Sequence, residues 1–204
     1  MDLLFGTRNP GKLRELRRLV AGLPTRVLSL DEVGRELPDV EEDGRTFEEN
    51  ARKKASAYAR AAGMHALADD SGLCVDALWG MPGIRSARWS EEERPGLSGA
   101  ARDGANNDKL LRALGGVLPE HRGAGYRAVV ALAAPDGTVL ATAEGDCRGA
   151  IGTEPRGDGG FGYDPLFLPE ARPDRTMAEL PPAEKDAISH RGEAMRRIVP
   201  ALRS

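Results

Sequence analysis

The segment 6–12, GTRNPGK, has the residue types and spacing of a phosphate-binding loop. It fits the pattern G-x-x-x-x-G-K between an apolar run and a helical pattern. The N–H groups of a helix start, together with Asn9 and the cation of Lys12, could hold a polyphosphate. Leu13 stands where a P-loop needs a Ser or Thr hydroxyl for magnesium, which argues against a kinase or GTPase. The alternative is an ordinary strand-to-helix turn with a surface lysine.

Two pairs of neighbouring acids, Asp69-Asp70 and Glu41-Glu42, could supply a divalent cation with ligands. Mg²⁺ prefers one or two carboxylates plus water and substrate oxygens, so this supply has the right size. Neighbouring side chains of a strand point to opposite faces, so we expect only one of Asp69 and Asp70 to face the metal. The alternative is that Asp69 caps a turn and Asp70 is solvated.

Other polar and aromatic residues could contact a nucleotide. Asn50 and Lys54 lie four residues apart on a predicted helix, hence on one face, and Lys54 could reach phosphate. The segment 157–164 has four glycines that allow close approach to a ligand, and Phe161 could stack on a base. The alternatives are a solvated lysine and a mobile surface loop. Three donors meet where the last predicted helix begins: Lys185, His190 and Arg191.

Sequence patterns predict the elements that position these residues. The apolar run 2–5 indicates a strand, and the apolar residues of 13–23 recur at helical spacing, with Asn9 as N-cap and Pro10 at the first position. A second helix is predicted from Thr46 to about Ala62, where Gly63 ends it.

The rest of the pattern alternates strands and helices. A strand over 64–68 is predicted to deliver Asp69 and Asp70 at its C-terminal end, and a helix to span 100–114. Strands over 126–134 and 138–147 form a hairpin, and the last helix starts after Ser189. We therefore expect an α/β protein with a mixed sheet.

Composition sets wider limits. With 204 residues, 40% of them hydrophobic, one domain over 1–204 is expected. A formal charge of -3 gives no overall attraction to nucleic acid or to an anionic membrane. No run approaches the roughly 20 apolar residues of a membrane span, so a cytoplasmic protein is expected. Cys74 and Cys147 are expected to be reduced structural thiols.

Six segments together resemble the inosine triphosphate pyrophosphatase family, whose members cleave non-standard purine nucleotides. They are TRNPGK at 7–12, TFEENA at 46–51 preceded by Glu41, ADDSGL at 68–73, PGIRSAR at 82–88, GGFGYDP at 159–165 and KDAISHRG at 185–192. Each is weak evidence alone, but the six occur in the family's order over nearly the whole chain. One departure from the family's pattern is Gly6, which stands where the family usually has a small residue such as Ala.

The resemblance implies a bilobed α/β fold with a long central mixed sheet flanked by helices, and a homodimer. It also implies Mg²⁺-dependent cleavage of ITP, dITP and XTP to the monophosphate and pyrophosphate. Glu41 and Asp70 would bind Mg²⁺, and Asp70 would be the catalytic proton acceptor. The expected substrate-binding residues are Thr7, Arg8, Asn9, Pro10, Gly11, Lys12, Lys54, Ser71, Phe161, Gly162, Tyr163, Asp164, Lys185, His190 and Arg191.

Base selection is predicted from the direction of hydrogen bonds. Hypoxanthine and xanthine present an acceptor oxygen at position six, whereas adenine presents an amino donor, so donors from His190 and Arg191 would reject ATP. Three alternatives remain open: a P-loop phosphotransferase, a non-catalytic nucleotide- or nucleic-acid-binding module, and a related fold that cleaves pyrimidine or methylated nucleotides. The near-neutral charge and the 4% of aromatic residues weigh against the second.

Overall fold

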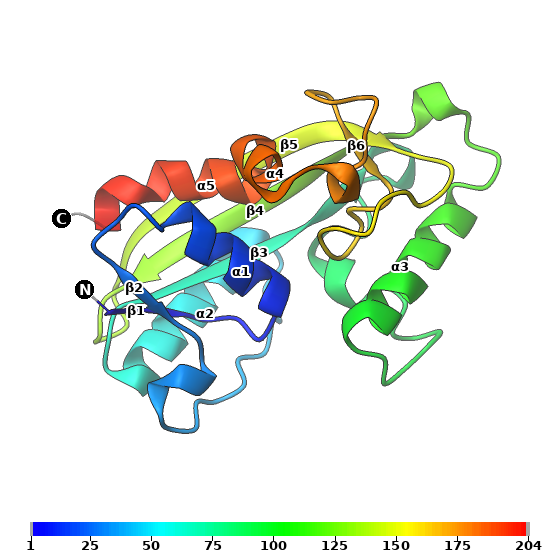
Figure 1. The fold of residues 1–204 in the computed structure, drawn as a ribbon. Coiled ribbons are helices and arrows are strands. Elements are labelled where there is room, and N and C mark those ends of the chain that lie inside the picture. Colours follow the sequence, from blue (N-terminus) through cyan, green and yellow to red (C-terminus); the bar gives the residue numbers. More distant parts are fainter. Residues whose placement is uncertain (1, 203–204) are drawn as a thin grey trace. The chain divides into compact units, whose positions relative to one another are not determined.

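The computed structural model describes residues 2–202, which divide into two compact units (Figure 1). The first unit comprises residues 2–70, Ala128–Gly145 and 190–202. The second unit comprises Ser71–Arg127 and Asp146–Ser189. Each unit is therefore assembled from separate stretches of the chain, and one domain over 1–204 stays a prediction.

A mixed sheet runs through the fold, as the sequence predicted. The strands are β1 (Asp2–Phe5), β2 (Arg26–Leu28), β3 (Ala66–Val75), β4 (Gly123–Ala133), β5 (Val139–Ile151) and β6 (Phe167–Pro169), in the order β2-β1-β3-β4-β5-β6. β1 pairs in parallel with β2 and β3, and β5 pairs antiparallel with β6. The expected hairpin joins β4 to β5, and Gly137 in its turn has a positive φ of 85°.

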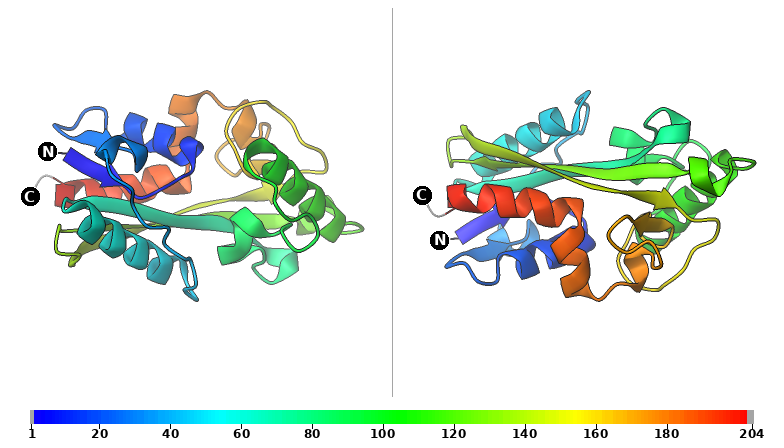
Figure 2. Two further views of the ribbon diagram at one scale, coloured as in Figure 1. Left: turned by 90° about the horizontal axis from the view of Figure 1, so that it is seen from below. Right: turned by 90° about the horizontal axis from the view of Figure 1, so that it is seen from above.

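Helices cover both faces of the sheet in the first unit. α1 (Pro10–Leu19) and α5 (His190–Ile198) lie on one face, and α2 (Phe47–Ala62) lies on the other (Figures 1 and 2). Strand alternation separates the two cores. Leu67 packs with α1 and α5, whereas Ala66 and Ala68 pack against α2.

The helix boundaries predicted from capping residues are confirmed. The Asn9 side chain accepts hydrogen bonds from the N–H groups of Gly11 and Lys12, at 2.8 and 3.2 Å. The Thr46 hydroxyl accepts from the N–H of Glu49 at 3.1 Å at the start of α2. Gly63 ends α2 in the left-handed conformation, with φ of 65°.

The predicted end of the strand before Asp69 is wrong. β3 continues through Asp70 to Val75, so both aspartates lie inside a ten-residue strand. The sequence Ser71-Gly72 has the composition of a turn, but Leu73 and Val75 after it are fully buried, and their burial extends the strand. The sequence did not predict β2, β6 or α4 (Pro182–Ile188), because these elements are too short to show a periodic pattern.

The second unit contains α3 (Gly99–Ala113), close to the predicted helix, and α4. Its core gathers Leu110 and Leu114 at the end of α3 with Tyr126, Phe167 and Leu166. The loop 157–165, which carries no helix or strand, belongs to this unit. Among the helices formed by residues 2–202, none is both long and apolar enough to cross a membrane.

Candidate active site

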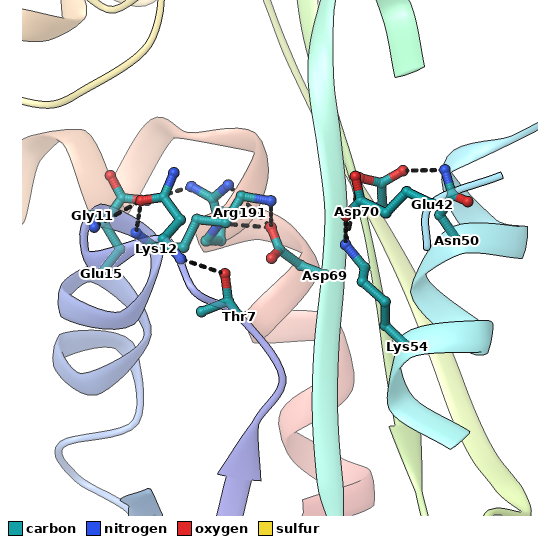
Figure 3. Close-up of polar contacts among 11 residues, drawn as sticks. Thr7, Gly11, Lys12, Glu15, Glu42, Asn50, Lys54, Asp69, Asp70 and Arg191 are labelled. Atoms are coloured by element: carbon teal, nitrogen blue, oxygen red, sulfur yellow. Dashed lines mark hydrogen bonds and ion pairs between the residues drawn. The ribbon is translucent and has the colours of Figure 1, made fainter. Parts of the chain in front are cut away.

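Asp69 and Asp70 point to opposite faces of β3, as their adjacent positions predict (Figure 3). Asp69 continues the face of Leu67, which meets α1 and α5. Asp70 continues the face of Ala68, which meets α2. The two carboxylates therefore lie in different surroundings although they are neighbours in the chain.

Asp69 is the centre of a buried ionic cluster, the Asp69 cluster, formed with Lys12, Glu15 and Arg191 (Figure 3). Its Oδ2 atom lies 3.1 Å from Lys12 Nζ and 3.1 Å from both Nε and Nη2 of Arg191. Glu15, one turn after Lys12 on α1, accepts a hydrogen bond from Nη1 of Arg191. The side chains of Asp69, Glu15 and Arg191 are each at most 6% exposed.

Two cations hold Asp69 in its ionised form. Burial disfavours its charge, but Lys12 and Arg191 outweigh that effect and hold the pKa of Asp69 well below its usual range. Burial likewise opposes the charge of Arg191, whose pKa is nevertheless raised by Asp69 and Glu15. Asp69 is therefore committed to ion pairs and is a poor proton acceptor.

Asp70 is the centre of a second group, the Asp70 cluster, formed with Glu42, Asn50 and Lys54 (Figure 3). Asn50 donates to Asp70 Oδ2 at 2.9 Å and accepts from the N–H of Gly44 at 2.8 Å. Lys54 Nζ lies 3.7 Å from Asp70 Oδ1 and donates a hydrogen bond to Glu42. Asn50 and Lys54 thus tie the segment before α2 to the middle of β3.

The pKa of Asp70 is displaced in the opposite direction to that of Asp69. Burial raises the pKa of Asp70, with opposition from the charges of Lys54 and Lys12 and reinforcement from Glu42. Burial works against the charge of Lys54, but Asp70 and Glu42 raise its pKa above the usual value. Two carboxylates whose pKa values are pushed apart are suited to different roles, and Asp70 is the better proton acceptor.

The loop 6–12 turns tightly into α1. Thr7 Oγ1 accepts from the N–H of Asn9 at 3.1 Å, which closes the turn before the cap. Pro10 and Gly11 form the first residues of α1, and Arg8 is exposed in an ion pair with Asp39 at 2.7 Å. A Cβ on Gly6 would lie 2.5 Å from the Tyr58 ring, which explains why this position has glycine.

The remaining predicted substrate-binding residues, apart from His190 and Arg191, lie in the second unit. Asp164 accepts from Lys185 Nζ and, at 2.8 Å, from the N–H of Phe161. Lys185 Nζ lies 5.0 Å from the centre of the Phe161 ring, a cation–π distance. Tyr163 is buried and donates to the Ser86 carbonyl at 2.9 Å. Ser71 opens the part of β3 that belongs to this unit.

Glu41 and Arg191 have surroundings that differ from those expected for their predicted roles. Glu41 is exposed, whereas its neighbour Glu42 reaches Lys54 and acts on Asp70. Arg191, expected to read a base, is bound to Glu15 and Asp69. His190 is buried as the first residue of α5.

Sequence reasoning missed Glu15 as part of the site and gave Asn50 no role in it. A weak signal existed for each residue. Glu15 follows Lys12 on one helix, and Asn50 precedes Lys54 by four residues on another. Neither signal could name a partner, because Arg191 lies 176 residues from Glu15.

The Asp70 cluster fits a magnesium ion. The Lys54 ammonium contacts both Glu42 and Asp70, so both carboxylates are directed at a common cation. Within residues 2–202, His, Cys, Asp and Glu side chains form no metal-binding group of three or more. Two carboxylates suit Mg²⁺, which retains water and binds substrate oxygens as well.

Comparisons with known proteins agree with the fold. The family model described as Ham1 family matches residues 3–201. A dITP/XTP pyrophosphatase of an Anaeromyxobacter species (strain Fw109-5) is 61% identical, covering 97% of this chain and 95% of the relative. The solved structure of a HAM1 protein from Coxiella burnetii has a TM-score of 0.82 at 37% identity, covering 99% and 98% of the two chains.

A third comparison concerns a nucleoside-triphosphatase / dITP/XTP pyrophosphatase from Mycobacterium abscessus. Its structure has a TM-score of 0.72 at 44% identity, covering 98% of this chain and all of its own. Fold, site and comparisons together define an enzyme of the nucleoside triphosphate pyrophosphatase class. The chain belongs to the Ham1 family.

Proposed function

We propose that the protein hydrolyses ITP, dITP and XTP, with Mg²⁺, to the monophosphate and pyrophosphate, and so removes these nucleotides from the nucleotide pool. The observation that carries the proposal is the Asp70 cluster, in which a buried carboxylate with a raised pKa faces Lys54 and Asn50. The names of the relatives support the substrate class, because they are dITP/XTP pyrophosphatases.

Asp70 and Glu42 are the proposed magnesium ligands. When bound, the ion would neutralise phosphate charge and polarise the phosphoryl group under attack. Glu42 is preferred to the neighbouring Glu41 because its carboxylate contacts Lys54, which also contacts Asp70. Glu41 is exposed.

Asp70 is also the proposed proton acceptor. Burial raises the pKa of Asp70, which makes its ionised form a stronger base for a proton leaving the attacking water. The hydrogen bond from Asn50 holds Oδ2, and therefore fixes how the carboxylate is turned. Attack at the α-phosphorus releases pyrophosphate, whose growing charge Lys12 and Lys54 would stabilise.

The loop 7–12 is the proposed phosphate-binding segment. The N–H groups at the start of α1 and the Lys12 ammonium are the donors that a polyphosphate requires. Lys12 pairs with Asp69, so phosphate oxygens would compete with that carboxylate for the ammonium.

Base recognition is proposed for the residues that the family resemblance assigns to it. Phe161 offers an aromatic surface for stacking, and Lys185 Nζ lies over its ring, 5.0 Å from the centre. Discrimination against ATP is expected because donors suit a six-oxo group and not an amino group. The ion pairs of Arg191 with Asp69 and Glu15 favour His190 over Arg191 for this contact.

Assembly as a homodimer, which the resemblance implies, and a cytoplasmic location, which the sequence pattern predicts, are part of the same proposal. Sedimentation of the purified protein at several concentrations tests the first. Recovery of the protein in the supernatant after membranes are pelleted tests the second.

The central test is product analysis. The purified protein is incubated with Mg²⁺ and ITP, dITP, XTP, ATP, GTP or a pyrimidine triphosphate, and pyrophosphate is measured separately from orthophosphate. The expected result is release of pyrophosphate from ITP, dITP and XTP, and not from ATP, GTP or the pyrimidine triphosphate. Orthophosphate as the first product would place the attack at the γ-phosphorus and overturn the proposal.

Matched variants test the residue roles. Asp70→Asn should lower kcat by at least about 10²-fold, the smaller end of the range for general base catalysis, with an unchanged circular dichroism spectrum. Glu42→Gln should raise the Mg²⁺ concentration needed for half-maximal activity, whereas Glu41→Gln should leave it close to that of the unsubstituted enzyme. The reverse order would assign the metal to Glu41.

A further inference from the structure

Two side chains of helix α3 form hydrogen bonds with both backbone polar groups of one residue, Gly162, in the Phe161 loop, defined as residues 157–164. Asp103 Oδ2 accepts from the N–H of Gly162 at 2.8 Å. Asn107 Nδ2 donates to the carbonyl of the same glycine at 3.0 Å. Asp103 and Asn107 lie four residues apart, hence on one face of α3, and both belong to the second unit together with the loop.

Gly162 is the neighbour in the chain of the residue that carries the aromatic ring. Gly162 follows Phe161 directly, and its φ of 63° is a conformation that glycine adopts readily. Within the loop, Asp164 accepts from the N–H of Phe161 at 2.8 Å and from Lys185. The backbone that carries the Phe161 ring is therefore held both by α3, through Gly162, and by Asp164.

Packing of α3 does not require these two polar residues. The buried positions of the helix are Ala105, Asn106 and Leu110, whereas Asp103 and Asn107 are only partly buried. The loop has no regular secondary structure, and the N–H and carbonyl groups of Gly162 are satisfied by the side chains of Asp103 and Asn107. The charge-assisted bond to Asp103 is the stronger kind.

We propose that Asp103 and Asn107 are positioning residues that set the place of the Phe161 ring and thereby control how tightly the purine base binds. The inference rests on the proposed function, because it takes Phe161 as the surface on which the base stacks. Neither residue is among the proposed phosphate-binding or magnesium-binding residues, so their effect should fall on binding of the base and not on the hydrolytic step.

The test uses steady-state kinetics with ITP and competitive inhibition by inorganic tripolyphosphate, which has no base. Asn107→Asp keeps the side-chain shape but replaces the donor facing the Gly162 carbonyl with an acceptor. KM for ITP should rise about tenfold, the equivalent of one lost hydrogen bond, while kcat stays within about twofold. The inhibition constant of tripolyphosphate should stay within about twofold, since the phosphate contacts are intact.

Asp103 provides a second variant and a rescue. Asp103→Ala should give the same selective rise in KM, whereas Asp103→Asn retains an acceptor oxygen and should recover most of the affinity for ITP. Asp108→Asn is the matched control because this exposed α3 residue pairs with Arg94 at 3.2 Å. It should leave KM unchanged.

Each outcome decides between the two proposals. An unsubstituted enzyme that does not hydrolyse ITP refutes the proposed function itself. If that enzyme is active but Asn107→Asp and Asp103→Ala leave KM unchanged, only the positioning role fails. A parallel weakening of tripolyphosphate and ITP would show a general structural defect and would also overturn the inference.

Discussion

Replacing Arg191 by alanine removes the cation that lies between two buried carboxylates. Arg191 contacts Glu15 through Nη1 and Asp69 at 3.1 Å through Nε and Nη2, and its side chain is 3% exposed. A buried carboxylate left without its cation typically costs about 3–5 kcal/mol of folding free energy. Asp69 retains Lys12 at 3.1 Å, so we expect a loss at the lower end of this range, about 3 kcal/mol.

Equilibrium urea unfolding followed by far-ultraviolet circular dichroism measures this loss. Arg197→Ala on the same helix is the control, because its exposed pair with Glu193 at 2.6 Å should contribute less than about 1 kcal/mol. If Arg191→Ala costs no more than Arg197→Ala, the Asp69 cluster does not stabilise the fold and the reasoning is refuted.

A double variant tests the cause of the loss. Glu15→Leu combined with Arg191→Ala removes the carboxylate that pairs with Arg191 as well as the cation. It should recover part of the stability that Arg191→Ala loses. A double variant no more stable than the single one would mean that the buried charge was not responsible.

Two further predictions concern other parts of the chain. Gly145→Ala should lower the melting temperature by several degrees, because its Cβ would lie 2.1 Å from the His190 carbonyl oxygen, and overpacking costs about 1–3 kcal/mol. Gly22→Ala, with nothing within 4 Å, is the control, and an equal effect would contradict the prediction. Burial raises the pKa of the Cys74 thiol, so at pH 8 the thiolate is scarcer than in free cysteine and alkylation should be slower, speeding up as pH rises. Mass spectrometry across a pH series measures this rate, and a rate equal to that of free cysteine would refute the prediction.

The sequence by itself determined the local elements of the fold. Asn9 before Pro10, Thr46 three residues before Glu49, and Gly63 set helix ends through contacts within a few residues, and the structure confirms them. The mixed sheet followed from the order of strand and helix patterns. These predictions succeed because capping and periodicity depend on residues close together in the chain.

The alternation of side chains along a strand also predicted that Asp69 and Asp70 point to opposite faces of the sheet. Only the tertiary structure decided which carboxylate meets which partner. Arg191 reaches Asp69 across 122 residues, and Lys54 selects Glu42 over Glu41 through the path of the segment before α2. Burial then raises the pKa of Asp70, while two cations lower that of Asp69. Such differences arise from desolvation and from charges brought close by folding, and no local pattern in the sequence encodes either.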